Sequence, residues 1–286
     1  IMNGGIFMSE ESRVYVVTGA DSGLGFALAQ ELKKKGTVIT GGIGDIVDVR
    51  ADLSTIEGRR QFINEIRKRS GGHIDGLALV AGIDSASALT LRLNYFGTIE
   101  ILKELRSLLA SSNSPSVVIV TSSSTLNKGS AALVKACLSG NEEKAVKLSN
   151  QLVRYGLGSK IYRSTKAALN SIVRTWSVNP DWAGSGIVLN AVAPGVIDTE
   201  AVLKQWPVHG EIFKASLPQP LGSPGPVASV VGLIAFLLSS ENRFTTGQVI
   251  YADGGTDALR RSDKPQRIYL KYTLKEMIRL VRIAKK

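Results

Sequence analysis

A glycine-rich turn directly after an apolar run constrains the fold of this chain more than any other feature. Residues 13–17 read RVYVV, which is typical of a buried strand, and TGADSGLG follows at residues 18–25. Gly19 turns the chain off the strand, Gly23 lets the backbone approach a pyrophosphate, and Gly25 lets the next helix pack closely. The turn predicts a dinucleotide-binding site at the start of a helix. Taken alone, a tight connection without a ligand is the alternative.

Seven apolar runs alternate with helical stretches along the chain. This alternation predicts an α/β fold, a doubly wound, seven-stranded parallel sheet of the Rossmann type with helices on both faces. With 286 residues, 44% of them apolar, the chain can bury one large core, and no linker or repeat divides it, so we expect a single domain. The expected strands are residues 14–17, 38–40, 46–49, 76–80, 117–121, 187–192 and 248–251.

A tyrosine and a lysine stand four residues apart in a segment with few helix breakers. These residues are Tyr162 and Lys166, within residues 161–177. A spacing of four places both side chains on one face of a helix. An ordinary tyrosine has a pKa near ~10, so proton exchange near neutral pH requires a lower pKa, which a neighbouring ammonium supplies. The pair indicates acid–base chemistry, although a chance pair on an exposed helix has the same spacing.

The order of the motifs carries a resemblance to a known family. The glycine turn is followed by Asn94, then by Ser123 after the fifth expected strand, and then by Tyr162 and Lys166. Over about residues 13–260, this order resembles that of the short-chain dehydrogenases/reductases. The resemblance implies an NAD(P)-dependent oxidoreductase that interconverts a secondary alcohol and a ketone by hydride transfer.

The resemblance also implies a role for each of these residues. Tyr162 would exchange a proton with the substrate oxygen, while Lys166 would lower the tyrosine pKa and hold the nicotinamide ribose. Ser123 would hydrogen-bond the substrate oxygen, and Asn94 would hold a water between Lys166 and solvent. Three serines are consecutive here, and neighbouring strand residues face opposite sides, so Ser122 is the main alternative to Ser123. For Asn94 the alternative is an amide that makes local bonds only.

The expected cofactor is NAD, with NADP not excluded. Asp21 and Ser22 stand in the glycine turn where members that prefer NADP often have Arg or Lys. An acid after the second strand would bind both ribose hydroxyls and repel a 2′-phosphate. Small or apolar residues occupy that position here, and the nearest acid, Asp45, lies two residues too far along the chain.

The implied cofactor site extends over the ends of several strands. Asp52 and Leu53 would contact the adenine, with an N-cap of the next helix as the alternative for Asp52. Ile197 and Thr199 would contact the nicotinamide side. The full set of implied cofactor-binding residues is Gly19, Asp21, Ser22, Gly23, Leu24, Gly25, Asp52, Leu53, Ala81, Gly82, Tyr162, Lys166, Pro194, Gly195, Ile197 and Thr199.

The 38 residues that separate Ser123 from Tyr162 are more than most relatives have there. They read as a helix over 131–138, a short turn and a second helix over 142–154, so we expect an insertion over about residues 126–158. Long insertions tend to form interfaces or carry function. This one enters the catalytic helix beside the faces where many relatives assemble tetramers. We therefore expect a homodimer with a different interface.

Together with the insertion, residues 51–58, 93–97 and 253–258 resemble the bacterial 3α-hydroxysteroid dehydrogenase/carbonyl reductase group. This narrower resemblance implies a hydroxysteroid or other small apolar carbonyl or alcohol substrate. Apolar residues after Thr199 stand where relatives keep a substrate lid, and a small core between lid helices is the alternative. These residues are Val202, Leu203, Trp206, Pro207, Ile212, Phe213 and Leu217.

Composition argues against several other classes of protein. A single cysteine, Cys137, excludes an internal disulfide and indicates a reducing compartment, and only two histidines argue against a histidine-rich metal site. We expect no metal. The chain has no uncharged apolar stretch of transmembrane length, and residues 1–12 lack the pattern of a signal peptide. The sequence therefore predicts a cytoplasmic enzyme with a leader over 1–12 and a catalytic domain over 13–260.

Basic residues gather in the expected tail, residues 261–286. From residue 262 onward this tail holds eight Lys or Arg and two acids, a net charge of +6 out of +11 for the chain. Contact with an anionic membrane surface is one interpretation, and a solvated terminal helix or a non-native extension is favoured. Because no platform of aromatic side chains accompanies the bases, nucleic-acid binding is not expected.

A second class of function remains open at this level. A catalytically silent dinucleotide-sensing or membrane-docked interaction protein would keep the same fold. The intact set of Asn94, Ser123, Tyr162 and Lys166 argues against that alternative.

Overall fold

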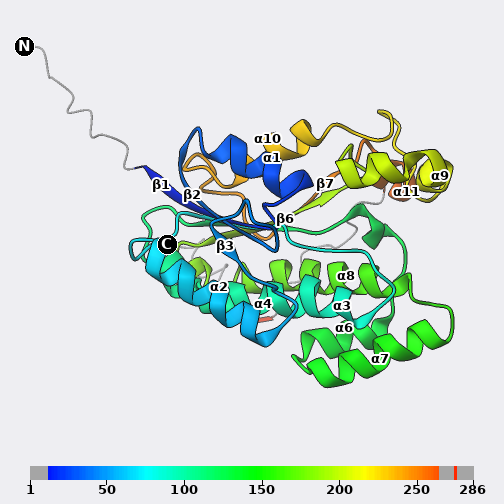
Figure 1. The fold of residues 1–286 in the computed structure, drawn as a ribbon, viewed down its shortest axis with the longest axis horizontal. Helices are drawn as coiled ribbons and strands as arrows, with labels where there is room; N and C mark the ends of the chain where they lie inside the picture. Colours follow the sequence, from blue (N-terminus) through cyan, green and yellow to red (C-terminus); the bar gives the residue numbers. More distant parts are fainter. Residues whose placement is uncertain (1–11, 264–273, 276–286) are drawn as a thin grey trace, which may run out of the picture.

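Seven parallel strands form one sheet at the centre of the molecule. The computed structural model describes residues 12–263 and 274–275. The strands are β1 (Arg13–Thr18), β2 (Gly36–Gly42), β3 (Val49–Arg50), β4 (Gly76–Leu79), β5 (Ser116–Val120), β6 (Val188–Pro194) and β7 (Val249–Ala252). Their order is β3-β2-β1-β4-β5-β6-β7, which confirms the predicted α/β class (Figure 1). The winding reverses between β1 and β4, the point where such sheets bind ligands at the carboxyl ends of their strands.

The predicted bounds of the third strand were wrong. Residues 46–48 form a loop, and β3 contains only Val49 and Arg50. Asp48 explains the difference, because its carboxylate accepts hydrogen bonds from the backbone N–H and the hydroxyl of Thr40, at 2.8 and 2.6 Å. These bonds hold the preceding residues away from the sheet, and Ile46 is 68% exposed.

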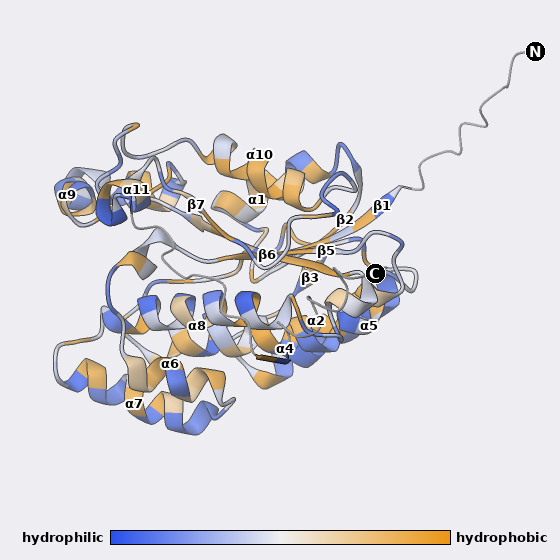
Figure 2. Ribbon diagram, turned by 180° about the vertical axis from the view of Figure 1, so that it is seen from behind, coloured by the Kyte–Doolittle hydropathy of each residue, from blue (hydrophilic) through white to orange (hydrophobic). Residues whose placement is uncertain are grey.

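Helices cover both faces of the sheet. The helices are α1 (Gly23–Leu32), α2 (Ile56–Arg69), α3 (Ala88–Leu91), α4 (Thr98–Glu104), α5 (Arg106–Ala110), α6 (Ala131–Leu138), α7 (Glu142–Arg154), α8 (Lys160–Trp176), α9 (Glu200–Ser216), α10 (Val227–Leu237) and α11 (Thr256–Arg261), with the π-helical η1 (Arg92–Gly97) and the 3-10 turns η2 (Ser123–Leu126) and η3 (Ala183–Ser185). Helices α1 and α10 pack on one face through Leu28 and Ile234. Helices α2 and α8 pack on the other through Phe62 and Leu169. In Figure 2, α10 is coloured largely hydrophobic, whereas α7 carries both hydrophilic and hydrophobic stretches.

The predicted insertion is a pair of helices, α6 and α7. The side chain of Ser130 caps α6 and that of Asn141 caps α7, each by accepting a backbone N–H bond. Gly140, at a φ of +71°, turns the chain between the two helices. Leu133 and Ala145 are fully buried and join the core under α8. The α6–α7 hairpin therefore extends the layer that carries Tyr162 (Figure 1).

The two ends assigned from the sequence fall largely outside the described residues. Of the expected leader only residue 12 is described, and of the basic tail only 261–263 and 274–275. The assigned domain bounds stay a prediction. In the described part of the chain, no helix has the length and apolar character needed to cross a membrane.

Candidate active site

The glycine turn lies where the winding of the sheet reverses. Gly19 and Gly23 have φ values of +65° and +50°, which side chains with a Cβ rarely adopt. A Cβ on Gly19 would come within 2.8 Å of Ala81 Cα, so the turn lies against the loop after β4. Ser22 is the N-cap of α1 but makes no side-chain capping bond. The first N–H groups of α1 are thus left for an anion, and this cradle fits the pyrophosphate of a dinucleotide.

The loop after β6 lies against the glycine turn. A Cβ on Gly23 would lie 3.4 Å from Thr199 Cγ2, so these two residues are close neighbours. Thr199 also caps α9 by accepting from the N–H of Val202. Gly195 packs so closely on the loop after β7 that a Cβ there would come within 2.9 Å of Asp253 Cα. The structure therefore brings together the glycine turn and the chain from Pro194, the last residue of β6, through Gly195 and Ile197 to Thr199.

Asn94 lies fully buried in the π-helical segment η1, a form of helix that often marks functional sites. Its Oδ1 accepts from the N–H of Ile83 at 2.9 Å, and its Nδ2 donates to the carbonyl of Ile83 at 2.8 Å. A Cβ on Gly82 would lie 3.2 Å from Asn94 Oδ1 and 3.3 Å from Lys166 Nζ. Asn94 therefore fixes the loop after β4 and lies next to the lysine of the predicted site.

Lys166 is buried between α8 and β5, with only 3% of its surface exposed. Its Nζ donates to the carbonyl of Val120 at 2.8 Å and lies 5.6 Å from the centre of the Tyr162 ring. Burial lowers the pKa of Lys166 to about 8, while the charge of Asp84 raises it. The side chain is mostly an ammonium at neutral pH.

The pKa of Tyr162 differs from the sequence-based prediction. Burial raises this pKa to about 12, a hydrogen bond with the hydroxyl of Ser122 lowers it, and the charge of Asp84 raises it further. Burial is the largest cause of this shift and Lys166 is not among its causes, so the expected lowering of the tyrosine pKa by Lys166 stays a prediction. Tyr162 is therefore a neutral phenol at pH 7, the form that donates a proton to a carbonyl oxygen.

The serine that interacts with Tyr162 is Ser122, so the structure favours the alternative to Ser123. The hydroxyl of Ser122 lowers the pKa of the Tyr162 phenol and accepts from the N–H of Ser124 at 3.1 Å. Ser123 is fully buried, and no described residue pairs with its Oγ. The reason lies in the backbone: β5 ends at Val120 and the 3-10 turn η2 begins at Ser123, so the alternation of a strand does not continue through the serines.

The expected adenine side of the site lies in the loop between β3 and α2. Asp52 is exposed, and its Oδ1 accepts from the N–H of Ser54 at 2.9 Å. Thr55 caps α2 by accepting from the N–H of Gly58, so the N-cap alternative for Asp52 was wrong. Leu53 is only 4% exposed, and its side chain belongs to the core.

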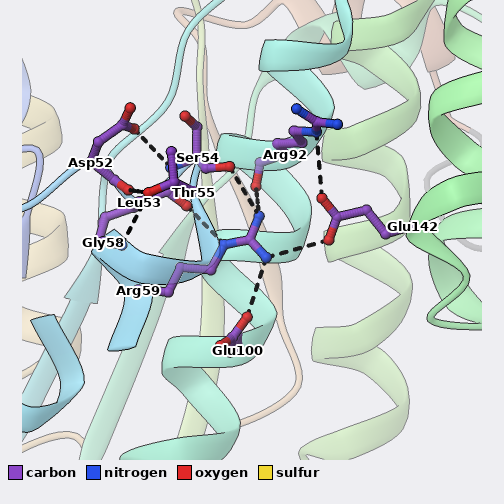
Figure 3. A network of polar contacts seen from close by, with 9 residues as sticks. All are labelled: Asp52, Leu53, Ser54, Thr55, Gly58, Arg59, Arg92, Glu100 and Glu142. Carbon is purple, nitrogen blue, oxygen red and sulfur yellow. Dashed lines mark hydrogen bonds and ion pairs between the residues drawn. The ribbon is translucent and has the colours of Figure 1, made fainter. Parts of the chain in front are cut away.

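Arg59, which sequence reasoning missed, holds this loop to the insertion (Figure 3). The side chain is 2% exposed, and its Nε donates to the carbonyl of Leu53 at 2.9 Å. Its Nη2 donates to the carbonyl of Arg92 in η1 at 3.0 Å. Its Nη1 lies 3.2 Å from Glu100 of α4 and 3.3 Å from Glu142 of α7. The only sequence signal is an arginine at an inward-facing position of an amphipathic helix.

Helix α9 carries the side chains predicted for a substrate lid. Gly210 is its only buried residue, while Leu203 and Ile212 are 49% and 63% exposed. The rings of Trp206 and Phe213 lie 6.2 Å apart. Trp206 and Phe213 are half-buried, so a small core between lid helices stays an alternative. Thr199 is the N-cap of α9, so the helix begins directly after the loop that follows β6.

Comparisons with known proteins agree with this geometry. The family model described as enoyl-(acyl carrier protein) reductase matches residues 39–257. The chain is 31% identical to the 3-alpha-hydroxysteroid dehydrogenase/carbonyl reductase of Comamonas testosteroni, over 87% of this chain and 98% of that protein. It is 25% identical to the 3-oxoacyl-(acyl-carrier-protein) reductase of Pseudomonas aeruginosa, over 87% of this chain and 98% of that protein.

A solved structure shows the same likeness in three dimensions. The 3-alpha-hydroxysteroid dehydrogenase from Pseudomonas sp. B-0831, complexed with NADH, has 35% sequence identity to this chain and a TM-score of 0.80. The match covers 88% of this chain and 99% of that one. With the family model matching most of its length, the chain belongs to the short-chain dehydrogenases/reductases, a family of NAD(P)-dependent oxidoreductases.

Proposed function

We propose that this protein interconverts a secondary alcohol and a ketone with NAD, and that its substrate is a hydroxysteroid or a related apolar carbonyl compound. The observation that carries the proposal is the position of Lys166, which is buried with its Nζ 5.6 Å from the centre of the Tyr162 ring. The exposed apolar side chains of Leu203 and Ile212 on α9 support an apolar substrate. The hydroxysteroid relatives, one of them complexed with NADH, support both the substrate class and the cofactor.

The residues of the site suit this reaction. The glycine turn and the loop after β6 would hold NAD, which would accept or donate the hydride when bound. During reduction, Tyr162 donates its proton to the carbonyl oxygen of the substrate. Ser122 donates a hydrogen bond to the same oxygen as negative charge develops there. Lys166 lies close enough to stabilise the phenolate that remains on Tyr162.

A panel of secondary alcohols with NAD and NADP tests the proposal. The panel includes 3α- and 3β-hydroxysteroids, and the absorbance of reduced nicotinamide reports turnover. We expect turnover of a 3α-hydroxysteroid with NAD. Turnover of other alcohols alone would contradict the steroid part of the proposal. Binding of NAD without any turnover would contradict catalysis and favour the dinucleotide-sensing alternative.

We also propose that the protein is a homodimer and that it is located in the cytoplasm. The α6–α7 hairpin leaves Leu138, Val153 and Tyr155 43%, 42% and 73% exposed. These side chains offer an apolar surface beside the catalytic helix, which supports a homodimer that uses this face. A cytoplasmic location is proposed because the single cysteine, Cys137, is a buried free thiol.

A further inference from the structure

Strand β2 ends without the acid that usually identifies the cofactor. In dinucleotide-binding folds, a carboxylate after the second strand binds the ribose hydroxyls of the adenosine and repels the 2′-phosphate of NADP. Here Gly42 ends the strand and Ile43 and Gly44 follow it. Asp45 is 85% exposed at its side chain and pairs with Arg50 at 2.5 Å. Another residue must supply the carboxylate if the chain is to select NAD.

Asp21 reaches this position from the glycine turn. Its Oδ2 accepts hydrogen bonds from the N–H groups of Ile43 and Gly44, both at 3.0 Å. A Cβ on Gly42 would come within 2.8 Å of the carboxyl carbon of Asp21, and one on Gly44 within 3.2 Å of its Cβ. The two glycines leave the space that this side chain fills. Its carboxylate therefore lies over the end of β2.

The geometry leaves part of this carboxylate available to a ligand. Both loop bonds use Oδ2, and no residue in the described part of the chain donates to Oδ1. Asp21 is partly exposed and stands one residue before the N-cap of α1, at the edge of the pyrophosphate cradle. If Asp21 served only to cap the loop, it would need no oxygen other than Oδ2. In that case it would not distinguish NAD from NADP.

The strand register places one cation, Arg50, opposite Gly42, and Asp45 engages its guanidinium. The partners of Asp21 among the described residues are backbone N–H groups, so its carboxylate has no ion pair with Arg50. A carboxylate accepts strong, charge-assisted hydrogen bonds from hydroxyls and repels a phosphate.

We propose that Asp21 is the residue that selects NAD over NADP, with Oδ1 accepting a hydrogen bond from the 2′-hydroxyl of the adenosine ribose. This inference rests on the proposed NAD-dependent function. It assigns to the glycine turn the recognition that other chains of this fold place at the end of the second strand. The Gly42-Ile43-Gly44 segment then contributes to the same cofactor selection, because it positions the carboxylate of Asp21.

Equilibrium binding of NADH and NADPH tests the inference without any turnover. Fluorescence or calorimetric titrations would compare the wild-type chain with Asp21→Asn and Asp45→Asn. Each variant removes one negative charge from the same region, and the amide oxygen of Asn at position 21 can still accept the loop bonds. We expect the wild type to bind NADH at least ~10-fold more tightly than NADPH, as expected for a charge-assisted hydrogen bond. Asp21→Asn should reduce that ratio about 10-fold, and Asp45→Asn should leave the NADH affinity within about 2-fold.

Each contrary result has a distinct meaning. Wild-type affinity for NADPH equal to or above that for NADH would overturn the assignment, whether or not the variants fold. An unchanged ratio in Asp21→Asn, or an equal loss of NADH affinity in Asp45→Asn, would overturn it too. Failure of the wild type to bind either dinucleotide would instead defeat the proposed function. Thermal unfolding of both variants confirms that they are folded when titrated.

Discussion

Two neighbouring hydroxyls, those of Ser122 and Ser123, have different surroundings and should contribute differently to catalysis. Ser122 lowers the pKa of the Tyr162 phenol, while Ser123 is buried with no partner for its Oγ among the described residues. Ser122→Ala should lower kcat by about 10²–10³-fold, the scale for losing one donor to a developing oxyanion. Ser123→Ala should change kcat by less than about 3-fold and leave stability nearly unchanged, because its hydroxyl has no bond to lose. A larger loss of kcat in Ser123→Ala would show that Ser123, and not Ser122, hydrogen-bonds the substrate oxygen.

Lys166 should make the stability of the protein depend on pH. Because burial lowers its pKa from 10.5 to about 8, the folded chain releases this proton at a lower pH than the unfolded chain. Between those two values the unfolded state binds more protons, so the free energy of unfolding rises with pH. In Lys166→Met this contribution is absent. From pH ~7 to ~10, the free energy of unfolding of the wild type should rise by up to about 3 kcal/mol relative to that of the variant.

Urea unfolding of both proteins at the two pH values measures this difference. The lost bond to Val120 affects the variant at both pH values and largely cancels in the comparison. A change of less than about 1 kcal/mol would show that the lysine is not perturbed by burial as described.

Some residues of the site follow from the sequence and others do not. Tyr162 and Lys166 could be predicted because a spacing of four fixes their relative direction on any helix. Which of the consecutive serines faces Tyr162 could not be predicted. The answer depends on where β5 ends and η2 begins. The direction of Asp21 depends on space left by glycines in another loop, and no local pattern in the chain reveals that contact.

Helix α7 is held to the rest of the protein through Glu142, which pairs with the buried Arg59 (Figure 3). Glu142→Gln should lower the free energy of unfolding by about 1–3 kcal/mol, the scale for a hydrogen bond to a charged group. Glu143→Gln is a matched control, because Glu143 is exposed on the same turn and should change stability by less than about 0.5 kcal/mol. Equal effects of the two variants in urea unfolding would contradict this attachment.

At the scale of elements, local chemistry explains which predictions succeeded. The hairpin of α6 and α7 could be predicted with its bounds because Ser130, Gly140 and Asn141 provide caps and a turn that act within a few residues. The bounds of the third strand could not be predicted from its apolar pattern. They depend on hydrogen bonds from Thr40 to Asp48, two residues that lie on either side of the loop.

For the whole molecule, the hairpin beside α8 predicts the oligomeric state. Its exposed apolar side chains support a dimer, so multi-angle light scattering should give twice the chain mass of 30.5 kDa. Tyr155→Glu would place a charge on this face and should shift the mass towards the monomer. A tetramer, or a dimer unaffected by this substitution, would contradict the assignment of the interface.

The most direct measurement compares Tyr162→Phe with the wild type in hydroxysteroid oxidation with NAD and in NADH binding. Loss of the phenolic hydroxyl should lower turnover by about 10²–10⁴-fold, the scale for removing a general acid or base, while NADH affinity stays within about 3-fold. That pair of results would establish Tyr162 as the proton-transfer group of an NAD-dependent oxidoreductase. Turnover unchanged by the substitution would contradict the mechanism.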